Sequence, residues 1–202
     1  MWFNNSYDPN AFGITFDWSS CRRIIDVGAH IGCFTVFAAS KSPQAKILAF
    51  EPAPENYEYL WRNTRRYKQV QLSNAAIGAE DGDALLQLHD SGGHSLVRQG
   101  QEQTPVRLTS LKSYLTEPCD FLKMDCEGAE YEALYSLTDD EAKNIRFLAL
   151  EYHHFSKEPG HNPNVLTQWL AARGFAMKLH RKSMLMAWRK EMLPGAPTIS
   201  LH

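Results

Sequence analysis

The segment IIDVGAHIGCFT, residues 24–35, decides the fold. It opens with apolar and β-branched residues that are typical of a short buried strand. Gly28 and Gly32 then indicate a turn, and the apolar residues that follow predict a helix over residues 33–40. Glycine allows the main chain to approach a ligand without a side-chain clash, and a helix N-terminus offers free N–H groups. The segment therefore indicates a ligand-binding turn at the end of a first strand.

Strands and helices alternate along the chain around this turn. Strands are predicted at residues 23–27, 46–50, 70–75, 120–124 and 146–151. Helices are predicted at residues 33–40, 54–66, 128–136 and 163–173, and the alternation is interrupted between residues 75 and 120. Residues 175–180 and 184–188 predict a closing hairpin. Such alternation is typical of a parallel sheet with helices on both faces.

Two regions depart from the alternation. Residues 84–108 predict a small β insertion, with short strands at 84–89, 95–98 and 106–108. Residues 1–20 are rich in turns and aromatic side chains, and we expect them to form an N-terminal lid or arm. Because 202 residues suit one domain with a substantial core, we expect residues 1–202 to form a single domain.

Composition excludes several classes of protein. A net charge of -2 does not suit a protein whose main partner is bulk nucleic acid, so we expect no nucleic-acid partner. The four cysteines include no C-x-x-C pair, and we expect reduced thiols. No apolar run approaches the roughly 20 residues of a membrane helix, and the N-terminus does not resemble a signal peptide. We therefore expect a cytoplasmic protein with no membrane partner.

The residues around the glycine turn narrow the choice of ligand. His30 stands where a dinucleotide motif has its middle glycine, and the third glycine is absent, which favours a nucleoside with an amino-acid tail. Asp26 can serve the ammonium group of that tail, directly or through water. Glu51 follows about 20 residues later, where acidic residues bind ribose hydroxyls. That spacing suits a nicotinamide cofactor or S-adenosylmethionine, and the glycine pattern with the C-terminal hairpin favours the second.

Five blocks of the sequence resemble the FkbM family of methyltransferases. They are IIDVGAHIGCFT, FEPAPENYEYLWRN, NAAIG, DFLKMDCEGAEYEAL and LALEYHH, within residues 24–155. The resemblance implies the class I methyltransferase fold, a Rossmann-like three-layer α/β sandwich with a mostly parallel seven-stranded sheet whose last strand is antiparallel. It also implies S-adenosyl-L-methionine as cofactor and methyl transfer, most often to a hydroxyl of a natural product or glycan. Family members usually have a longer N-terminal region, so we expect the substrate lid to be shortened or supplied differently.

The cofactor residues follow from the glycine turn and the ends of the next two strands. In this fold the end of the third strand holds the adenine. The residues predicted to bind the cofactor are Asp26, Gly28, His30, Gly32, Glu51, Pro52, Asn74 and Ala76.

The catalytic residues are predicted at the carboxyl ends of the fourth and fifth strands, where ligands bind in open parallel sheets. We predict that His153 or His154 accepts the proton of the acceptor hydroxyl, while Asp125 and Glu151 orient the acceptor or the imidazole. We predict no metal ion, although Asp125, Glu151 and His153 leave open a divalent metal that acidifies the hydroxyl. Helix capping accounts for Glu127 and Glu130.

Several alternatives stay open at this stage. We expect a small-molecule or glycan acceptor, and a homodimer remains open. Residues 62–68 contain four cationic side chains that fit a solvated helix face, with an RNA patch as the alternative. Other hypotheses are N-methylation of a peptide or RNA, a cofactor-binding module without activity, and a nicotinamide-dependent oxidoreductase.

Overall fold

A seven-stranded sheet forms the centre of the computed structural model, which describes residues 5–87, 103–153, 158–180 and 183–189. The strand order is β3-β2-β1-β7-β8-β10-β9. In chain order these strands are β1 (Arg23–Val27), β2 (Lys46–Phe50), β3 (Val70–Ser73), β7 (Phe121–Met124), β8 (Phe147–Glu151), β9 (Phe175–His180) and β10 (Met184–Arg189). β10 runs antiparallel to both of its neighbours, and the other pairs of the sheet are parallel. The predicted mostly parallel sheet with an antiparallel last strand is confirmed.

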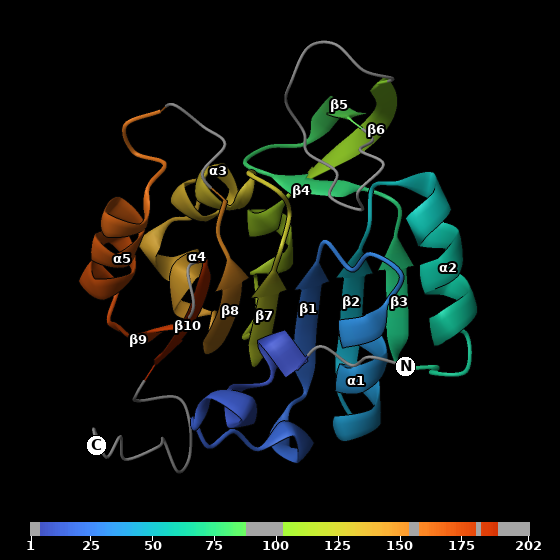
Figure 1. Cartoon of the computed structure of the whole chain (residues 1–202), viewed down its shortest axis with the longest axis horizontal. Helices are drawn as coiled ribbons and strands as arrows, with labels where there is room; N and C mark the ends of the chain where they lie inside the picture. The colour runs from blue at the N-terminus through green and yellow to red at the C-terminus, as the bar shows by residue number, and fades with distance from the viewer. Residues whose placement is uncertain (1–4, 88–102, 154–157, 181–182, 190–202) are drawn as a thin grey trace.

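Helices cover both faces of this sheet (Figure 1). They are α1 (Cys33–Lys41), α2 (Pro54–Thr64), α3 (Glu130–Tyr135), α4 (Asp139–Lys143) and α5 (Pro163–Ala172). One core contains Ile25 and Leu122 with side chains of α3 and α5, and the other contains Ile24 and Phe121 with side chains of α1 and of residues 14–18. Neighbouring residues of one strand belong to different cores because side chains alternate along a strand. The result is the expected three-layer sandwich.

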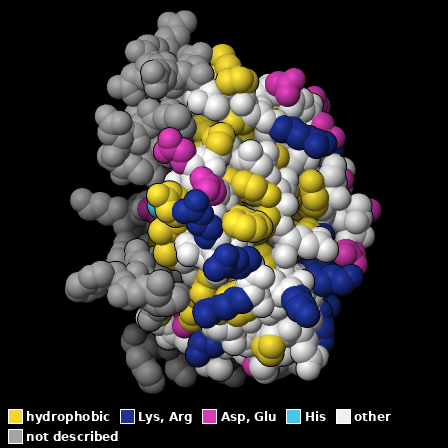
Figure 2. All heavy atoms as spheres, turned by 90° about the vertical axis from the view of Figure 1, so that its right-hand side faces the viewer, with side chains coloured by type: hydrophobic (Ala, Val, Ile, Leu, Met, Phe, Trp, Pro, Cys, Tyr) yellow, Lys and Arg dark blue, Asp and Glu magenta, His cyan; other side chains and the backbone are white. Residues whose placement is uncertain are grey.

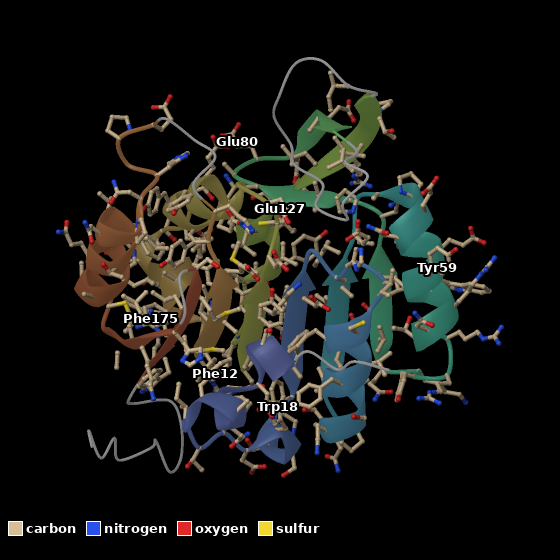
Figure 3. All side chains as sticks on the ribbon, in the orientation of Figure 1. Phe12, Trp18, Tyr59, Glu80, Glu127 and Phe175 are labelled. Atoms are coloured by element: carbon tan, nitrogen blue, oxygen red, sulfur yellow. The ribbon has the colours of Figure 1, made fainter. Side chains whose placement is uncertain are left out.

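Residues 5–20 pack against the same face of the sheet as α1. They form the short 3-10 helices η1 (Asn5–Tyr7), η2 (Pro9–Phe12) and η3 (Trp18–Ser20). Phe16 and Trp18 are buried against Phe121. Trp18 lies near the lower edge of the molecule, well below Glu127 (Figure 3). The Asp8 carboxylate accepts hydrogen bonds from Trp18 Nε1 at 3.0 Å and from the main-chain N–H of Asn10 at 3.1 Å. The arm is therefore anchored from Asp8 onward.

A second, three-stranded sheet lies above the carboxyl ends of the main strands (Figure 1). Its order is β4-β6-β5, with β4 (Ala76–Gly78), β5 (Gly82–Gln87) and β6 (Gln103–Ser110). The structure confirms strands near residues 84–89 and 106–108, while the strand predicted at 95–98 lies outside the described residues. β4 was not predicted because its three residues follow β3 too closely to be separated by pattern. This small sheet covers the edge at which a ligand is expected.

The other differences from the sequence prediction are confined to short elements. The 3-10 helix η4 (Leu111–Tyr114) follows β6. α4 was missed because its five residues are too few to show a helical period, although Thr138 and Glu141 form a capping box that marks its start. All four cysteines are free thiols, as expected. Within the described parts of the chain, no helix combines the length and apolar character needed to cross a membrane.

The surface beside α2 carries the basic stretch of residues 62–68 (Figure 2). Its four cationic residues, Arg62, Arg65, Arg66 and Lys68, are exposed. Arg62 forms an ion pair with Glu58 one helical turn away and lies over the ring of Tyr59. Arg62 fits the predicted solvated helix face, whereas the other three residues are exposed but lie beyond the end of α2.

Candidate active site

The glycine turn after β1 is held against the end of β7. Gly28 has a φ of +71°, and a Cβ atom at this position would lie 1.7 Å from the main-chain oxygen of Asp125. No other residue fits this contact, because the atom in the way belongs to the main chain. Gly32 has a φ of +90° and its Cβ would lie 2.8 Å from Leu60 Cδ1. The two glycines thus serve a left-handed turn that packs closely on both sides.

Glu51 closes the turn at the end of β2. Its carboxylate accepts a hydrogen bond from the main-chain N–H of His30 at 2.8 Å and one from that of Ala53 at 3.0 Å. Glu51 is 5% exposed, whereas the His30 side chain is exposed. His30 has a φ of 52°, in the left-handed region. The contribution of His30 at this position is therefore its main-chain N–H, which holds the carboxylate in place.

A pocket opens between this turn, the end of β7 and the small sheet. Its cavity volume is about 210 Å³, slightly below the roughly 300–1,000 Å³ that is usual for ligand pockets. The lining residues are Val27, Gly28, His30, Phe50, Glu51, Pro52, Asn56, Ala75, Ala76, Ile77, Leu86, Asp125, Cys126 and Glu127. Glu51 supplies an almost buried carboxylate to the wall, and Ile77 and Leu86 supply apolar surface. This combination fits a nucleoside, whose ribose needs acceptors and whose base needs an apolar slot.

The predicted cofactor residues are placed in two groups by the structure. Gly28, His30, Glu51, Pro52 and Ala76 line the pocket. Gly32, Asn74 and Asp26 are absent from its lining. The Asn74 side chain donates to the main-chain oxygens of Glu51, at 2.8 Å, and Pro52, at 3.0 Å, which supports the pocket wall from behind. The cofactor roles assigned to all eight residues stay predictions.

Asp26 forms a buried ion pair beneath the turn. Its Oδ1 lies 3.2 Å from Lys123 Nζ, and its Oδ2 accepts a hydrogen bond from Thr35 Oγ1 at 2.5 Å. The side chains of Asp26 and Lys123 are 0% and 3% exposed. Lys123 also donates to the main-chain oxygens of Val27 and Gly28. Burial alone lowers the pKa of Lys123, but the charges of Asp26 and Asp125 outweigh it and raise that pKa, so this lysine is a fixed cation.

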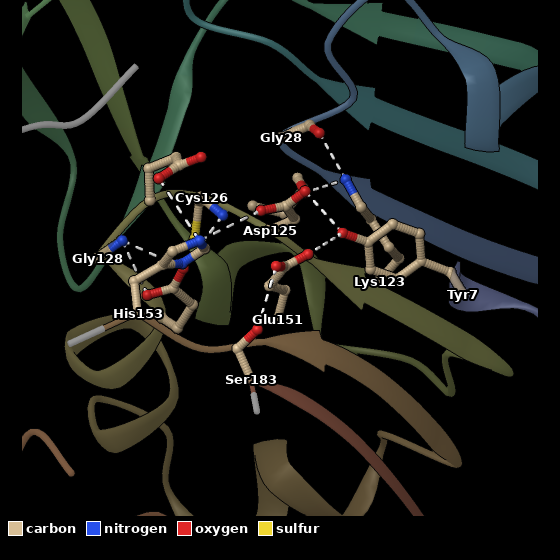
Figure 4. Close-up of polar contacts among 12 residues, drawn as sticks. Tyr7, Gly28, Lys123, Asp125, Cys126, Gly128, Glu151, His153 and Ser183 are labelled. Atoms are coloured by element: carbon tan, nitrogen blue, oxygen red, sulfur yellow. Dashed lines mark hydrogen bonds and ion pairs between the residues drawn. The ribbon is translucent and has the colours of Figure 1, made fainter. Parts of the chain in front are cut away.

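Asp125 and Glu151 come together at the ends of adjacent strands, as the sequence predicts, and Tyr7 lies between them (Figure 4). The Tyr7 hydroxyl is 2.7 Å from Asp125 Oδ2 and 3.0 Å from Glu151 Oε2. Ser183 Oγ donates to the other oxygen of Glu151 at 3.3 Å. Burial, reinforced by the charges of the two carboxylates, raises the pKa of Tyr7 far above its usual range. The phenol therefore stays protonated.

His153 lies on the other side of Asp125. Its Nδ1 is 2.8 Å from Glu130 Oε1, and its Nε2 is 3.5 Å from Glu127 Oε2 and 4.0 Å from Asp125 Oδ1. Burial alone would lower the pKa of His153. The hydrogen bond to Glu130 and the charges of Glu130, Glu127 and Asp125 together outweigh burial and raise this pKa from 6.5 to about 9. The ring is a cation at neutral pH in this state, which argues against a role as proton acceptor. That role remains a prediction, and His154 lies outside the described residues.

The ring also belongs to a set of side chains that could hold a metal ion. One atom each of Asp125, Glu127 and His153 lie within 4.8 Å of one another. The third possible metal ligand is thus Glu127, whereas the sequence left Glu151 open for this position. The capping role predicted for Glu130 is not observed, because α3 has no side-chain hydrogen bond at its N-cap. Its carboxylate instead accepts hydrogen bonds from main-chain N–H groups of the preceding turn, those of Cys126, at 3.3 Å, and Gly128, at 2.9 Å.

Two parts of the site escaped sequence reasoning. Tyr7 was treated only as one of several early aromatic residues, and nothing in its surroundings in the sequence links it to Asp125. Ile77 and Leu86 were not expected in the pocket because the path of the small sheet could not be deduced. The position of Lys123 inside an apolar strand was a signal that this lysine needs a buried partner.

Comparisons with known proteins agree with this geometry. The family model described as the methyltransferase FkbM domain matches residues 26–177. Methyltransferase 1 of Beauveria bassiana (strain ARSEF 2860) is 31% identical over 146 residues, which are 58% of this chain and 59% of that protein. The AMB antimetabolite synthetase AmbE of Pseudomonas aeruginosa is 26% identical over 210 residues, which cover 80% of this chain and 10% of the synthetase. The chain thus spans less than two thirds of the length of each of these relatives.

A solved structure shows the same fold. The methyltransferase FkbM from Methylobacillus flagellatus KT superposes with a TM-score of 0.64, covering 93% of this chain and 48% of that one. Its sequence identity is 15%, so the likeness is one of fold. The family model, in contrast, matches three quarters of the chain and includes the glycine turn, Glu51, Asp125 and Glu151. The chain belongs to the FkbM family of methyltransferases.

Proposed function

We propose that the chain transfers the methyl group of S-adenosyl-L-methionine to a hydroxyl group of a small natural product or glycan. The observation that carries the proposal is a single pocket that contains the Gly28 turn and Glu51 on one side and Asp125 on the other. In this proposal residues 1–202 act as one methyltransferase domain, with residues 1–20 as an arm beside the site.

Residues of the pocket fit this cofactor. Glu51 would accept the ribose hydroxyls, the turn at Gly28 would lie beside the amino-acid tail, and Ile77 and Leu86 would enclose the base. Because Lys123 neutralises Asp26 beneath the turn, the ammonium group of the tail would bind main-chain oxygens of the turn rather than Asp26. The cofactor would supply an activated methyl group on its sulfur, and the acceptor oxygen would gain this group in exchange for its proton.

Asp125 and Glu151 are the residues to which we assign the proton of the acceptor hydroxyl. They already surround one hydroxyl, that of Tyr7, at 2.7 and 3.0 Å. His153 is a cation in this state and contributes positive charge beside Asp125. A positioned base of this kind contributes typically about 10²–10⁴-fold to the rate.

Two observations support a small acceptor. AmbE, which contains a similar segment, is named as the synthetase of an antimetabolite. Asp125, Glu127, Glu130 and Glu151 also place several carboxylates at the acceptor side, where the phosphates of RNA would be repelled.

The experiment that tests the cofactor assignment measures binding of S-adenosylhomocysteine, the product form, by calorimetry. We expect Glu51→Gln to weaken the affinity by roughly tenfold to hundredfold, because hydrogen bonds to a carboxylate are each worth about 1.5–3 kcal/mol. Glu55→Gln removes an exposed carboxylate on α2 and is the matched control, with unchanged affinity. Thermal unfolding of both variants verifies that they remain folded.

Two results would contradict the proposal. One is wild-type protein that binds NAD or NADP more tightly than S-adenosylhomocysteine. The other is equal affinity of wild type and a folded Glu51→Gln variant for S-adenosylhomocysteine, which would place the ribose elsewhere.

A further inference from the structure

The Tyr7 side chain occupies a space with the properties of a binding site for a phenol. Four side chains surround it, namely Phe34, Lys123, Asp125 and Glu151. The Phe34 ring meets the Tyr7 ring edge to face, with centroids 5.9 Å apart and an interplanar angle of 76°. Lys123 Nζ lies 5.1 Å from the Tyr7 ring centroid, within the range of a cation–π contact. We call this space the Tyr7 slot.

The hydroxyl end of the slot has more acceptor capacity than one phenol can use. The Tyr7 hydroxyl has one proton and lies close to carboxylate oxygens of both Asp125 and Glu151. It can donate to only one of them at a time, and an ionised carboxylate only accepts. The pair therefore retains an oxygen that is ready to take a proton from a hydroxyl placed between the two side chains.

The slot adjoins the cofactor pocket. Asp125 belongs to both, because it lines the pocket and accepts the hydrogen bond of Tyr7. Lys123 also joins them, since it lies over the Tyr7 ring and donates to the main-chain oxygen of Gly28. A hydroxyl in the slot is therefore next to the space in which the methyl donor is proposed to lie.

Tyr7 can leave the slot without loss of the rest of the arm. The anchoring contacts of the arm begin at Asp8, which binds Trp18 and Asn10, and the buried Phe16 and Trp18 follow. The contacts of Tyr7 with the site involve only its own side chain. Loss of this side chain is thus expected to vacate the slot and leave the fold intact.

We propose that the Tyr7 slot is the acceptor subsite, that Tyr7 fills it in the acceptor-free protein, and that the acceptor presents a hydroxyl on a flat aromatic ring. The inference rests on the proposed function and refines it from hydroxyl compounds in general to phenols. The slot favours a phenol because Lys123 lies over the ring and Phe34 packs against it, whereas a sugar ring lacks the π-electrons that attract the ammonium group.

The test fills the slot of a Tyr7→Ala variant of the full chain with p-cresol, which replaces the missing side chain. Binding is measured by calorimetry in the presence of S-adenosylhomocysteine, and without it. We expect p-cresol to bind Tyr7→Ala at least about tenfold more tightly than wild type, and toluene to bind the variant roughly tenfold more weakly than p-cresol, because toluene cannot donate to the carboxylates. With S-adenosylmethionine, the variant should form 4-methylanisole, detected by mass spectrometry.

Matched variants separate the slot from other sites. Tyr7→Phe keeps the ring in place and should bind no p-cresol. Tyr59→Ala removes an exposed tyrosine on α2 and should behave like wild type. Tyr7→Ser is a second truncation, used if the alanine variant does not fold.

The outcomes are decisive in both directions. Binding and methylation of p-cresol by the truncated variant alone support the proposal. Equal binding to wild type, absence of binding to the folded variant, or binding without methylation in a variant that binds S-adenosylmethionine would each overturn it. Failure of wild type to bind S-adenosylmethionine would count against the proposed function instead, and binding of p-cresol would still decide the slot.

Discussion

The cofactor side of the site and its acceptor side are built from different kinds of groups. The cofactor side consists of Gly28, His30 and Glu51, and main-chain groups shape it: Gly28 lies against the main chain of Asp125, and two main-chain N–H groups bind the Glu51 carboxylate. The acceptor side consists of Tyr7, Asp125, Glu151 and His153, which are joined through their side chains. A main-chain turn is fixed by its own short sequence, whereas a group of side chains depends on where distant segments meet.

The largest expected effect is a loss of stability from a substitution on the cofactor side. Gly28→Ala places a Cβ atom 1.7 Å from the main-chain oxygen of Asp125, so β1 and β7 must separate. We expect a loss of more than about 4 kcal/mol in the free energy of unfolding, or no folded protein. Gly13→Ala is the matched control, since Gly13 has a φ of +70° and no atom within 4 Å of its Cβ position. That control should lose about 1 kcal/mol.

Urea unfolding of the two glycine variants measures this difference. Equal stability of Gly28→Ala and Gly13→Ala would show that the close contact with Asp125 is unimportant, and that only the backbone conformation of the turn matters.

The next largest effect concerns the buried ion pair of Lys123 with Asp26, which lies beneath both sides of the site. Lys123→Met removes the partner of the buried Asp26 carboxylate and should destabilise the protein by about 3–5 kcal/mol. Lys143→Met, which breaks the exposed pair with Asp140, should cost less than about 1 kcal/mol. Asp26→Asn added to Lys123→Met should restore part of the stability, because no buried charge is then left unpaired. Similar urea midpoints for the two lysine variants would contradict the structural role of Lys123.

The smallest effect concerns the acceptor side and appears as a dependence on pH. Because the pKa of His153 is raised from 6.5 to about 9, its charge stabilises the folded state below pH 6.5, and this contribution is lost as the pH rises through 9. Since one pKa unit corresponds to about 1.4 kcal/mol and partial exposure screens the charges, we expect a loss on the order of 2 kcal/mol.

The measurement compares the free energies of unfolding of wild type and His153→Gln from pH 6 to pH 9.5. Wild type should be the more stable at the acid end and should approach the variant at the alkaline end. Parallel curves would mean that the ring is neutral throughout, and would return His153 to the role of proton acceptor.

The same comparison shows what the sequence could predict. The strand at residues 23–27, the turn from Gly28 to Gly32 and the position of Glu51 follow from local pattern, and the structure places Gly28 and Glu51 in one pocket. The meeting of Asp125 with Glu151 also follows, because adjacent parallel strands end at one edge. Tyr7 could not be placed, since its position depends on how residues 5–20 pack beneath the sheet. The charge of His153 depends on Glu130, whose carboxylate binds the turn before α3 and lies 2.8 Å from the ring.

The contact between Gly28 and Asp125 has a consequence for how related enzymes can diverge. The main-chain oxygen of Asp125 is enclosed by the cofactor side, while its carboxylate faces the acceptor side. The main chain at this position is therefore constrained in any descendant that keeps the methyl donor. Changes at Tyr7 carry no such constraint, because its side chain touches the cofactor turn only through other side chains. New acceptors are expected to evolve through the arm, with the position of Asp125 held constant.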